Sequence, residues 1–230
     1  MSDILHYEHR DSVAVLRLDD GKANAISMTM IDSLNAALDR AEKEAGGVLL
    51  LGRAGRFSAG FDLNTMREGP DAARRLVSEG GLLLARMAEA PLPIVAGCTG
   101  HALAMGALLL LASDVRLGAQ GEFRLGLNEV SIRMTLPMFA IELAQERLSR
   151  RHLIRSAVLA EIYDPQTACD AGYLDRVVAT EELEAQAFSE AARLAELPRG
   201  AFSGTKRLVR GPTVERIRAS LEDAASWSLG

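Results

Sequence analysis

The feature that most restricts the fold of this chain is an alternation of short apolar runs with helical segments. The runs VLLLG at 48–52, IVAGC at 94–98 and DVRLGA at 114–119 are too short for typical helices. Such runs are typical of strands buried in a parallel sheet. Residues 70–89 and 103–112, which lie between them, are predicted to be helices. Because strands and helices alternate, the sequence predicts an α/β protein.

The N-terminal segment is predicted to open the fold with a hairpin, from two short strands at 4–10 and 12–18. A helix with one apolar face is expected to begin after Ser27, a suitable N-cap, and to stop at Gly46-Gly47. That face consists of Met30, Ile31, Leu34, Ala37, Leu38 and Ala41. Strand and helix units of about 40 to 50 residues thus recur, which favours a coiled or spiral arrangement.

The C-terminal part of the chain has a helical pattern. Helices are expected at 136–148 and 150–159, and the final stretch from Glu181, which contains Trp227, is almost wholly helical. It is expected to break into about three pieces at Pro198, Gly200, Gly204 and Gly211-Pro212. We therefore predict a core at 1–180 and a C-terminal helical cap or trimerisation region at 181–230.

Composition and charge exclude several classes of protein. Of the 230 residues, 48% are hydrophobic and 25% charged, which is an ordinary globular balance rather than that of a disordered chain. The net charge of −5 argues against nucleic-acid binding. Cys98 and Cys169 form neither a disulfide framework nor a metal motif, and the apolar run at 102–112 is too short to span a membrane. With no signal-peptide pattern in the first twenty residues, we expect a cytoplasmic protein.

A turn of small residues follows the apolar run at 48–52. In the segment GRFSAGFDL at 55–63, Ser58, Ala59 and Gly60 let another group approach the backbone closely. The turn can leave an N–H group facing a cavity. Taken alone, an ordinary strand-to-helix turn is the simpler explanation.

A second turn of small residues, GHALAMGA at 100–107, follows the run at 94–98. The helix that it opens presents unpaired N–H groups and a positive dipole end, which suit a developing negative charge. Close packing of a buried helix on a sheet explains the same residues without a ligand.

Glu129 lies between apolar residues in LGLNEV at 125–130. A carboxyl group in an apolar pocket has a raised pKa, as a general base needs when it must take a weakly acidic proton and return it. A surface glutamate is the alternative. His101 and His152 are more simply explained as packed imidazoles, and the chain lacks the motifs of serine hydrolases, dinucleotide sites and P-loops.

The two turns and the glutamate together resemble the order of parts in the crotonase superfamily (enoyl-CoA hydratase/isomerase family). FSAGFDL is similar to its first oxyanion motif, AGxDL, which assigns one N–H donor to Phe61, and residues 100–114 resemble the second motif, which assigns the other to Met105. Residues 164–178 resemble the family's A-x-x-x-G-L-V-x-x-V segment, and 205–210 its C-terminal helical region. The resemblance covers nearly the whole chain and implies a crotonase-like spiral of ββα units with a C-terminal helical region.

The resemblance implies an acyl-CoA enzyme that holds a thioester enolate between two backbone N–H groups. Family hydratases use two glutamates to hold and activate water, and the corresponding positions here are Leu108 and Glu129. The string GLNE is similar to the Δ3,Δ2-enoyl-CoA isomerases, which move a double bond with a single glutamate. The resemblance thus favours isomerisation of 3-enoyl-CoA to 2-enoyl-CoA, with Glu129 as the base.

Three alternatives stay open at this point. They are a hydratase that works with one glutamate, a thioester hydrolase, and a non-catalytic homologue with an RNA-binding or scaffolding role. The net charge of −5 disfavours the RNA-binding role. The chain also departs from the family pattern at Met105, where glycine is more usual. Arg133-Met134-Thr135 likewise replaces a glycine-rich stretch.

The resemblance also implies where coenzyme A lies. Backbone atoms of Ala23 and Ala25 are expected near the pantetheine and adenine, with Lys22 near a phosphate and Ala59 and Gly60 in the same binding region. Coenzyme A enters as part of the substrate, and no metal or redox cofactor is implied. The family further implies a homotrimer or hexamer, without nucleic-acid or membrane partners.

Overall fold

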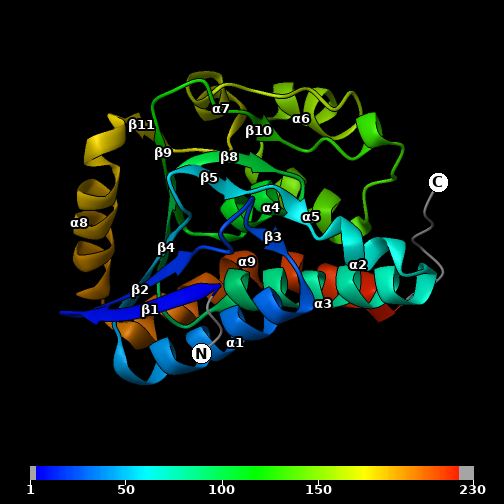
Figure 1. Ribbon diagram of the computed structural model, residues 1–230. Coiled ribbons are helices and arrows are strands. Elements are labelled where there is room, and N and C mark those ends of the chain that lie inside the picture. Colours follow the sequence, from blue (N-terminus) through cyan, green and yellow to red (C-terminus); the bar gives the residue numbers. More distant parts are fainter. Residues whose placement is uncertain (1–3, 223–230) are drawn as a thin grey trace.

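The five predicted strands and a sixth at 176–178, which was not predicted, build a six-stranded sheet in the computed structural model, which describes residues 4–222 (Figure 1). β1 and β2 form the expected antiparallel hairpin, and every later neighbour in the sheet is parallel. In spatial order, the strands are β1 (Leu5–Arg10), β2 (Val13–Leu18), β4 (Gly47–Leu51), β7 (Ile94–Cys98), β9 (Val115–Ala119) and β11 (Arg176–Val178). The α/β class predicted from the alternation is confirmed.

Three successive turns of the chain each add one strand, β4, β7 or β9, to this sheet and the next strand to a smaller sheet. The small sheet is parallel and consists of β5 (Gly55–Ser58), β8 (Gly100–Leu103) and β10 (Leu125–Gly126). Two further strands, β3 (Ala25–Ile26) and β6 (Gly60–Phe61), pair with each other. The expected spiral is confirmed, and it brings the C-terminal ends of the small-sheet strands to one edge.

The helices surround and fill this spiral. They are α1 (Met28–Glu44), α2 (Leu63–Arg67), α3 (Pro70–Glu89), α4 (Met105–Ala112), α5 (Met138–Arg147), α6 (Arg150–Ala157), α7 (Pro165–Ala171), α8 (Leu183–Ala195) and α9 (Arg199–Glu222). In α1, the Ser27 hydroxyl accepts the Met30 N–H as the predicted N-cap. The six apolar residues predicted to face the core are the ones that are buried.

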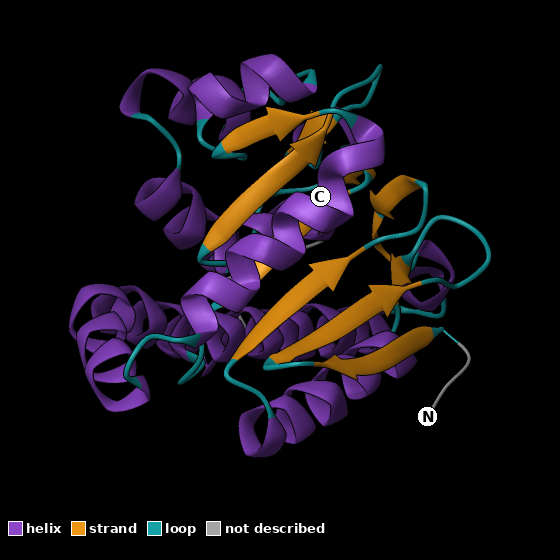
Figure 2. Cartoon of the chain, turned by 90° about the vertical axis from the view of Figure 1, so that its left-hand side faces the viewer, coloured by secondary structure: helices purple, strands orange, loops and turns teal. Residues whose placement is uncertain are grey.

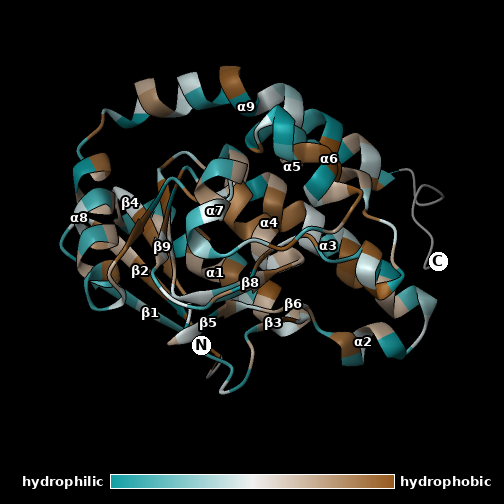
Figure 3. Ribbon diagram, turned by 90° about the horizontal axis from the view of Figure 1, so that it is seen from above, coloured by the Kyte–Doolittle hydropathy of each residue, from teal (hydrophilic) through white to brown (hydrophobic). Residues whose placement is uncertain are grey.

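Helix α4 lies at the centre of the molecule, where all eight of its residues are buried (Figure 3). It begins at Met105 rather than at the predicted residue 103, because residues 100–103 pair as β8 with the strands on either side. Burial on every side explains why this helix has no polar face. Among the described helices, none has the length and hydrophobicity that crossing a membrane requires.

Helix α8 covers one face of the large sheet (Figures 1 and 2). Its buried residues Leu183, Ala187 and Ala191 pack against sheet residues such as Leu49 and Val95. The apolar face of this helix is therefore occupied within its own chain.

Helix α9 corrects the prediction of a C-terminal region in about three pieces. Pro198 separates α8 from α9, but α9 continues through Gly200, Gly204 and Gly211-Pro212. A proline inside a helix costs about 3 kcal/mol. Packing against α3 and α5 offsets that cost, and the buried Arg210 side chain donates to the Ala112 carbonyl oxygen at 2.7 Å. Trp227 lies outside the described residues.

Candidate active site

The predicted coenzyme A loop and the first small-residue turn lie against each other. Ala25 pairs with Gly60 between β3 and β6, and the Ala59 N–H donates to the Ala23 carbonyl oxygen at 3.0 Å. Lys22 and Ala59 are exposed at this surface, whereas Gly60 is buried. The structure thus brings together the five residues assigned to coenzyme A by resemblance.

A buried asparagine that the sequence analysis missed joins these two loops. Asn24 is fully buried, and its side-chain amide donates to the carbonyl oxygens of Leu18 at 2.9 Å and Phe57 at 3.2 Å. The buried Ser58 hydroxyl donates to the Asn24 carbonyl oxygen at 2.7 Å. Asparagine and aspartate in the turn-forming stretch DDGKAN were the available signal, since both stabilise turns through their side chains.

Asp20 holds the same loop from within. Its carboxylate accepts the backbone N–H groups of Lys22 at 2.7 Å, Asn24 at 2.8 Å and Ala25 at 3.1 Å. Burial opposes ionisation of Asp20, but these three donors lower its pKa. The carboxylate therefore stays charged and fixes the shape of the loop.

Replacing Asn24 with alanine is expected to lower the free energy of unfolding by about 3 kcal/mol, because buried carbonyl oxygens lose their donor. Asn24 also has φ of 53°, a conformation that alanine resists. Asn24→Gly should cost about 1 kcal/mol less, since glycine adopts this conformation freely. Urea unfolding of both variants tests this, and a loss below about 1 kcal/mol for alanine would contradict the role of the side chain.

The N–H group of Phe61 is directed away from β3. Along a parallel strand pair, alternate residues direct their N–H groups to the partner strand. The Asp62 N–H donates to the Ile26 carbonyl oxygen at 3.0 Å, so the N–H of the preceding residue, Phe61, faces the other way. The same loop lies against the start of α4, because a Cβ built on Gly60 would lie 2.9 Å from the Ala104 Cβ and 3.5 Å from the Met105 nitrogen.

Met105 is the first residue of α4, and an unusual backbone conformation precedes it. Ala104 has φ of 50° and ψ of −122°, which residues other than glycine rarely adopt and which costs about 1 to 3 kcal/mol. The Leu108 N–H closes the first helical turn by donating to the Ala104 carbonyl oxygen. The N–H of Met105 therefore lies at the open, positive end of the helix. Two N–H groups, those of Phe61 and Met105, thus emerge from loops in contact.

The side chains of these two residues pack onto α3. Met105 is fully buried, and a Cβ built on Gly80 would lie 3.4 Å from its Cε and 2.5 Å from the Phe61 ring. Any residue other than glycine at position 80 would displace the ring. Met105 therefore directs its side chain into the core against α3, while its backbone stays at the helix end.

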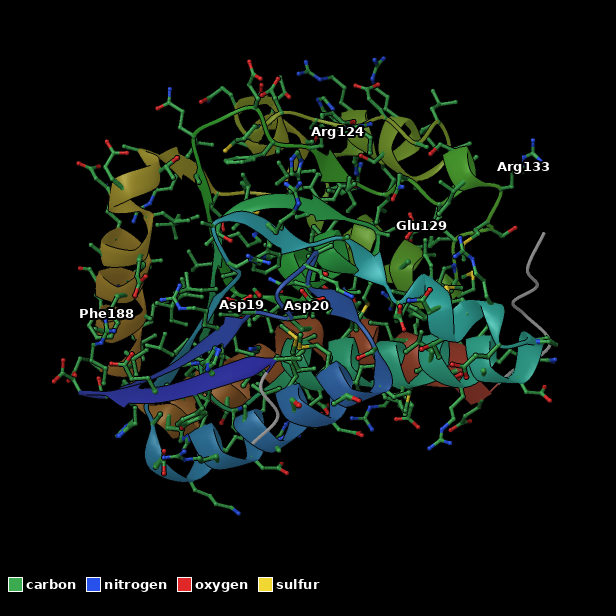
Figure 4. All side chains as sticks on the ribbon, in the orientation of Figure 1. Asp19, Asp20, Arg124, Glu129, Arg133 and Phe188 are labelled. Carbon is green, nitrogen blue, oxygen red and sulfur yellow. The ribbon has the colours of Figure 1, made fainter. Side chains whose placement is uncertain are left out.

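Glu129 follows the third strand of the small sheet. β10 runs parallel to β8, and the Ala104 N–H donates to the Gly126 carbonyl oxygen at 3.0 Å, so Glu129 and Met105 leave the sheet at the same edge. Glu129 is only 7% exposed, and its Oε2 has no hydrogen-bond partner among the described residues. Burial raises its pKa to about 7. In Figure 4 it lies at a height between α6 above and α2 below, as labelled in Figure 1, whereas Arg133 projects outward.

Other candidate positions have structural roles. Leu108 is buried within α4, so the place of a second glutamate is apolar. His101 accepts the Arg124 N–H at 3.0 Å on Nδ1 and packs edge-on against Phe123. Arg133, in the stretch where the family has glycines, has a left-handed φ of 66°. Within residues 4–222, no three His, Cys, Asp or Glu side chains are grouped to hold a metal ion.

Comparisons with known proteins agree on one family. A family model described as enoyl-CoA hydratase/isomerase matches residues 8–224. Human enoyl-CoA delta isomerase 1, mitochondrial, is 28% identical over 213 residues, covering 89% of this chain and 70% of that protein. A probable enoyl-CoA hydratase of Rhodobacter capsulatus is 30% identical over 212 residues, covering 88% of this chain and 79% of that protein. The crystal structure of an enoyl-CoA hydratase/isomerase family protein from Pseudomonas syringae has a TM-score of 0.96 at 43% identity, covering 98% of this chain and 99% of that one.

Proposed function

Because the chain belongs to the enoyl-CoA hydratase/isomerase family, we propose that it moves the double bond of a 3-enoyl-CoA to give the 2-enoyl-CoA. The observation that carries this proposal is the buried carboxyl group of Glu129, at the edge where the N–H groups of Phe61 and Met105 emerge. Leucine at position 108 supports isomerisation over hydration, since water would have one carboxylate to hold it instead of two.

The reaction needs one base and one site for negative charge. The Glu129 carboxylate removes a proton from C2, and the electron pair of that bond moves into the thioester as an enolate. The N–H groups of Phe61 and Met105 donate to the enolate oxygen, where loss of one donor typically costs about 3 to 4 kcal/mol. The carboxylic acid then returns the proton to C4, which leaves the double bond between C2 and C3 and Glu129 ionised.

The rest of the substrate is assigned to the neighbouring loop. We propose that the turn with the exposed Lys22 and the half-buried Ala23 and Ala25 binds coenzyme A together with Ala59 and Gly60, supported by the hydrogen bond between the two segments. Assembly into a homotrimer or hexamer is proposed on the family resemblance alone. The apolar face of α8 does not support it, because that face is covered by the sheet of its own chain.

The pH dependence of the reaction should follow the ionisation of Glu129. Burial raises its pKa to about 7, and the base must be ionised to accept a proton. We therefore expect kcat/KM to fall about tenfold per pH unit below pH 7 and to level off above it. A profile between pH 5 and 9 tests this; a curve flat down to pH 5 would mean that the base is an ordinary exposed carboxylate.

The function is tested by giving the protein 3-enoyl-CoA and 2-enoyl-CoA substrates of short and medium chain in separate reactions. We expect absorbance of the conjugated enoyl thioester to appear from the 3-enoyl substrates. Loss of that absorbance from 2-enoyl-CoA, with 3-hydroxyacyl-CoA formed, would instead show a hydratase. If neither substrate reacts, a different coenzyme A ester or a non-catalytic role is favoured.

A further inference from the structure

The carbonyl end of helix α4 is completed by a side chain from the C-terminal helix. The last four carbonyl oxygens of a helix have no partner within it, and this end carries a partial negative charge. In α4, the hydroxyl and N–H groups of Ser113 satisfy two of them. The guanidinium group of Arg210, in α9, donates to the other two, those of Leu111 at 3.0 Å and Ala112 at 2.7 Å. Arg210 thus binds the far end of the helix that begins at Met105.

Buried ion pairs fix the direction of the Arg210 side chain. Arg210 is only 4% exposed, its Nε donates to Glu146 Oε1 of α5 at 2.8 Å, and its Nη1 lies 3.8 Å from the Asp114 carboxylate. Asp114 in turn accepts the Lys206 ammonium group at 2.7 Å and the Ile94 N–H at 2.8 Å. The planar guanidinium group is therefore held in one orientation, and it connects the end of α4 to α5, α9 and β7.

The carbonyl end of α4 and the Met105 N–H belong to one rigid element. The eight residues of α4 form a helix about 12 Å long, and their buried side chains make contacts that have no preferred direction. Just before the helix, the Ala104 N–H donates to the Gly126 carbonyl oxygen, so polar contacts hold α4 at both ends. Without Arg210, the helix would be free to tilt about the remaining contact, and the direction of the Met105 N–H would change.

We propose that Arg210 is a positioning residue for the oxyanion site, which holds α4 so that the Met105 N–H points at the enolate oxygen. A donor serves an oxyanion at about 2.7 to 3.1 Å, and a misplacement of about 1 Å costs on the order of 10²-fold in rate. The inference rests on the proposed function for the role of Met105 as a donor. It makes α9 part of the catalytic framework, where the sequence predicted only a cap or trimerisation region.

The kinetic test compares two arginines of α9. Arg210→Lys keeps the charge but loses the paired donors that reach two carbonyl oxygens. We expect kcat to fall about tenfold or more, with KM changed less than about twofold, because the lost alignment acts on the transition state. Arg216→Lys is the matched control, since Arg216 also pairs with α5, through Glu142 at 2.6 Å, and donates otherwise only to Thr213 within the described residues. It should keep kcat within about twofold of the wild type.

The direct test needs no turnover. In protein labelled with ¹⁵N-methionine, the amide resonance of Met105 is the one missing from Met105→Leu. We expect this resonance to shift in Arg210→Lys and to keep its position in Arg216→Lys. If the wild type converts no 3-enoyl-CoA, the proposed function is overturned, and this comparison still decides whether Arg210 positions the Met105 N–H.

A second arginine keeps the inference testable if Arg210→Lys does not fold. Arg147 of α5 donates to the next two carbonyl oxygens, those of Ser113 at 3.2 Å and Asp114 at 3.1 Å, so Arg147→Lys is expected to shift the Met105 resonance as well. A Met105 resonance that stays unchanged in the folded variant overturns the inference. Equal losses of kcat in Arg210→Lys and Arg216→Lys also overturn it, because they would mean that both arginines only hold α9 to α5.

Discussion

Replacing Glu129 with glutamine is expected to lower kcat for the conversion of 3-enoyl-CoA to 2-enoyl-CoA by about 10³-fold, with little change in KM. The amide has nearly the same shape but accepts no proton from C2. The rate is followed by the absorbance of the conjugated product. Retention of more than about a tenth of the wild-type kcat would mean that another group is the base.

The stability of the same variant shows whether Glu129 is as buried as the structure indicates. Its pKa is raised from 4.5 to about 7 in the folded state, so its contribution to stability is full below pH 4.5 and is lost as pH rises through 7. Glutamine does not ionise. The free energy of unfolding of Glu129→Gln, relative to that of the wild type, should therefore be up to about 3 kcal/mol higher at pH 8 than at pH 4. Urea unfolding of both proteins at pH 4 and pH 8 measures this. If the difference between variant and wild type is the same at the two pH values, the raised pKa is contradicted.

Replacing Gly106 with alanine is expected to lower kcat/KM by about 10²-fold or more, because it separates the two N–H loops. A Cβ at this position would lie 2.3 Å from the Ser58 carbonyl oxygen, so α4 must move away from the first loop. Overpacking of this kind also costs about 1 to 3 kcal/mol of stability. Steady-state kinetics and urea unfolding measure the two effects.

Gly204→Ala is the matched control for this substitution. Gly204 lies inside α9, and a Cβ built there has no atom within 4 Å. Alanine should raise the free energy of unfolding by up to about 1 kcal/mol through its helix propensity and leave kcat/KM unchanged. An equal loss of activity in both variants would contradict the assignment of Gly106 to the contact between the loops.

Helix α9 shows where local patterns failed. Gly204 and Gly211-Pro212 are ordinary signals for helix ends, yet the helix continues through them. The contacts that stabilise it come from α3, α5 and the end of α4, all distant in sequence. The hydrogen bonds by which Asn24 and Ser58 join the two loops were missed for the same reason, since the partners of Asn24 lie up to 34 residues away.

The sequence by itself determined the alternation of strands and helices, the buried face of α1, and the two small-residue turns and glutamate that carry the family resemblance. These follow from periodicity, glycine content and motif order, which are local properties of the chain. Only the tertiary structure decided that Phe61, Met105 and Glu129 come together at the same edge of the fold. It also decided that Glu129 is buried deeply enough to raise its pKa to about 7. Parallel strands far apart in sequence create that edge, and desolvation depends on everything packed around a group.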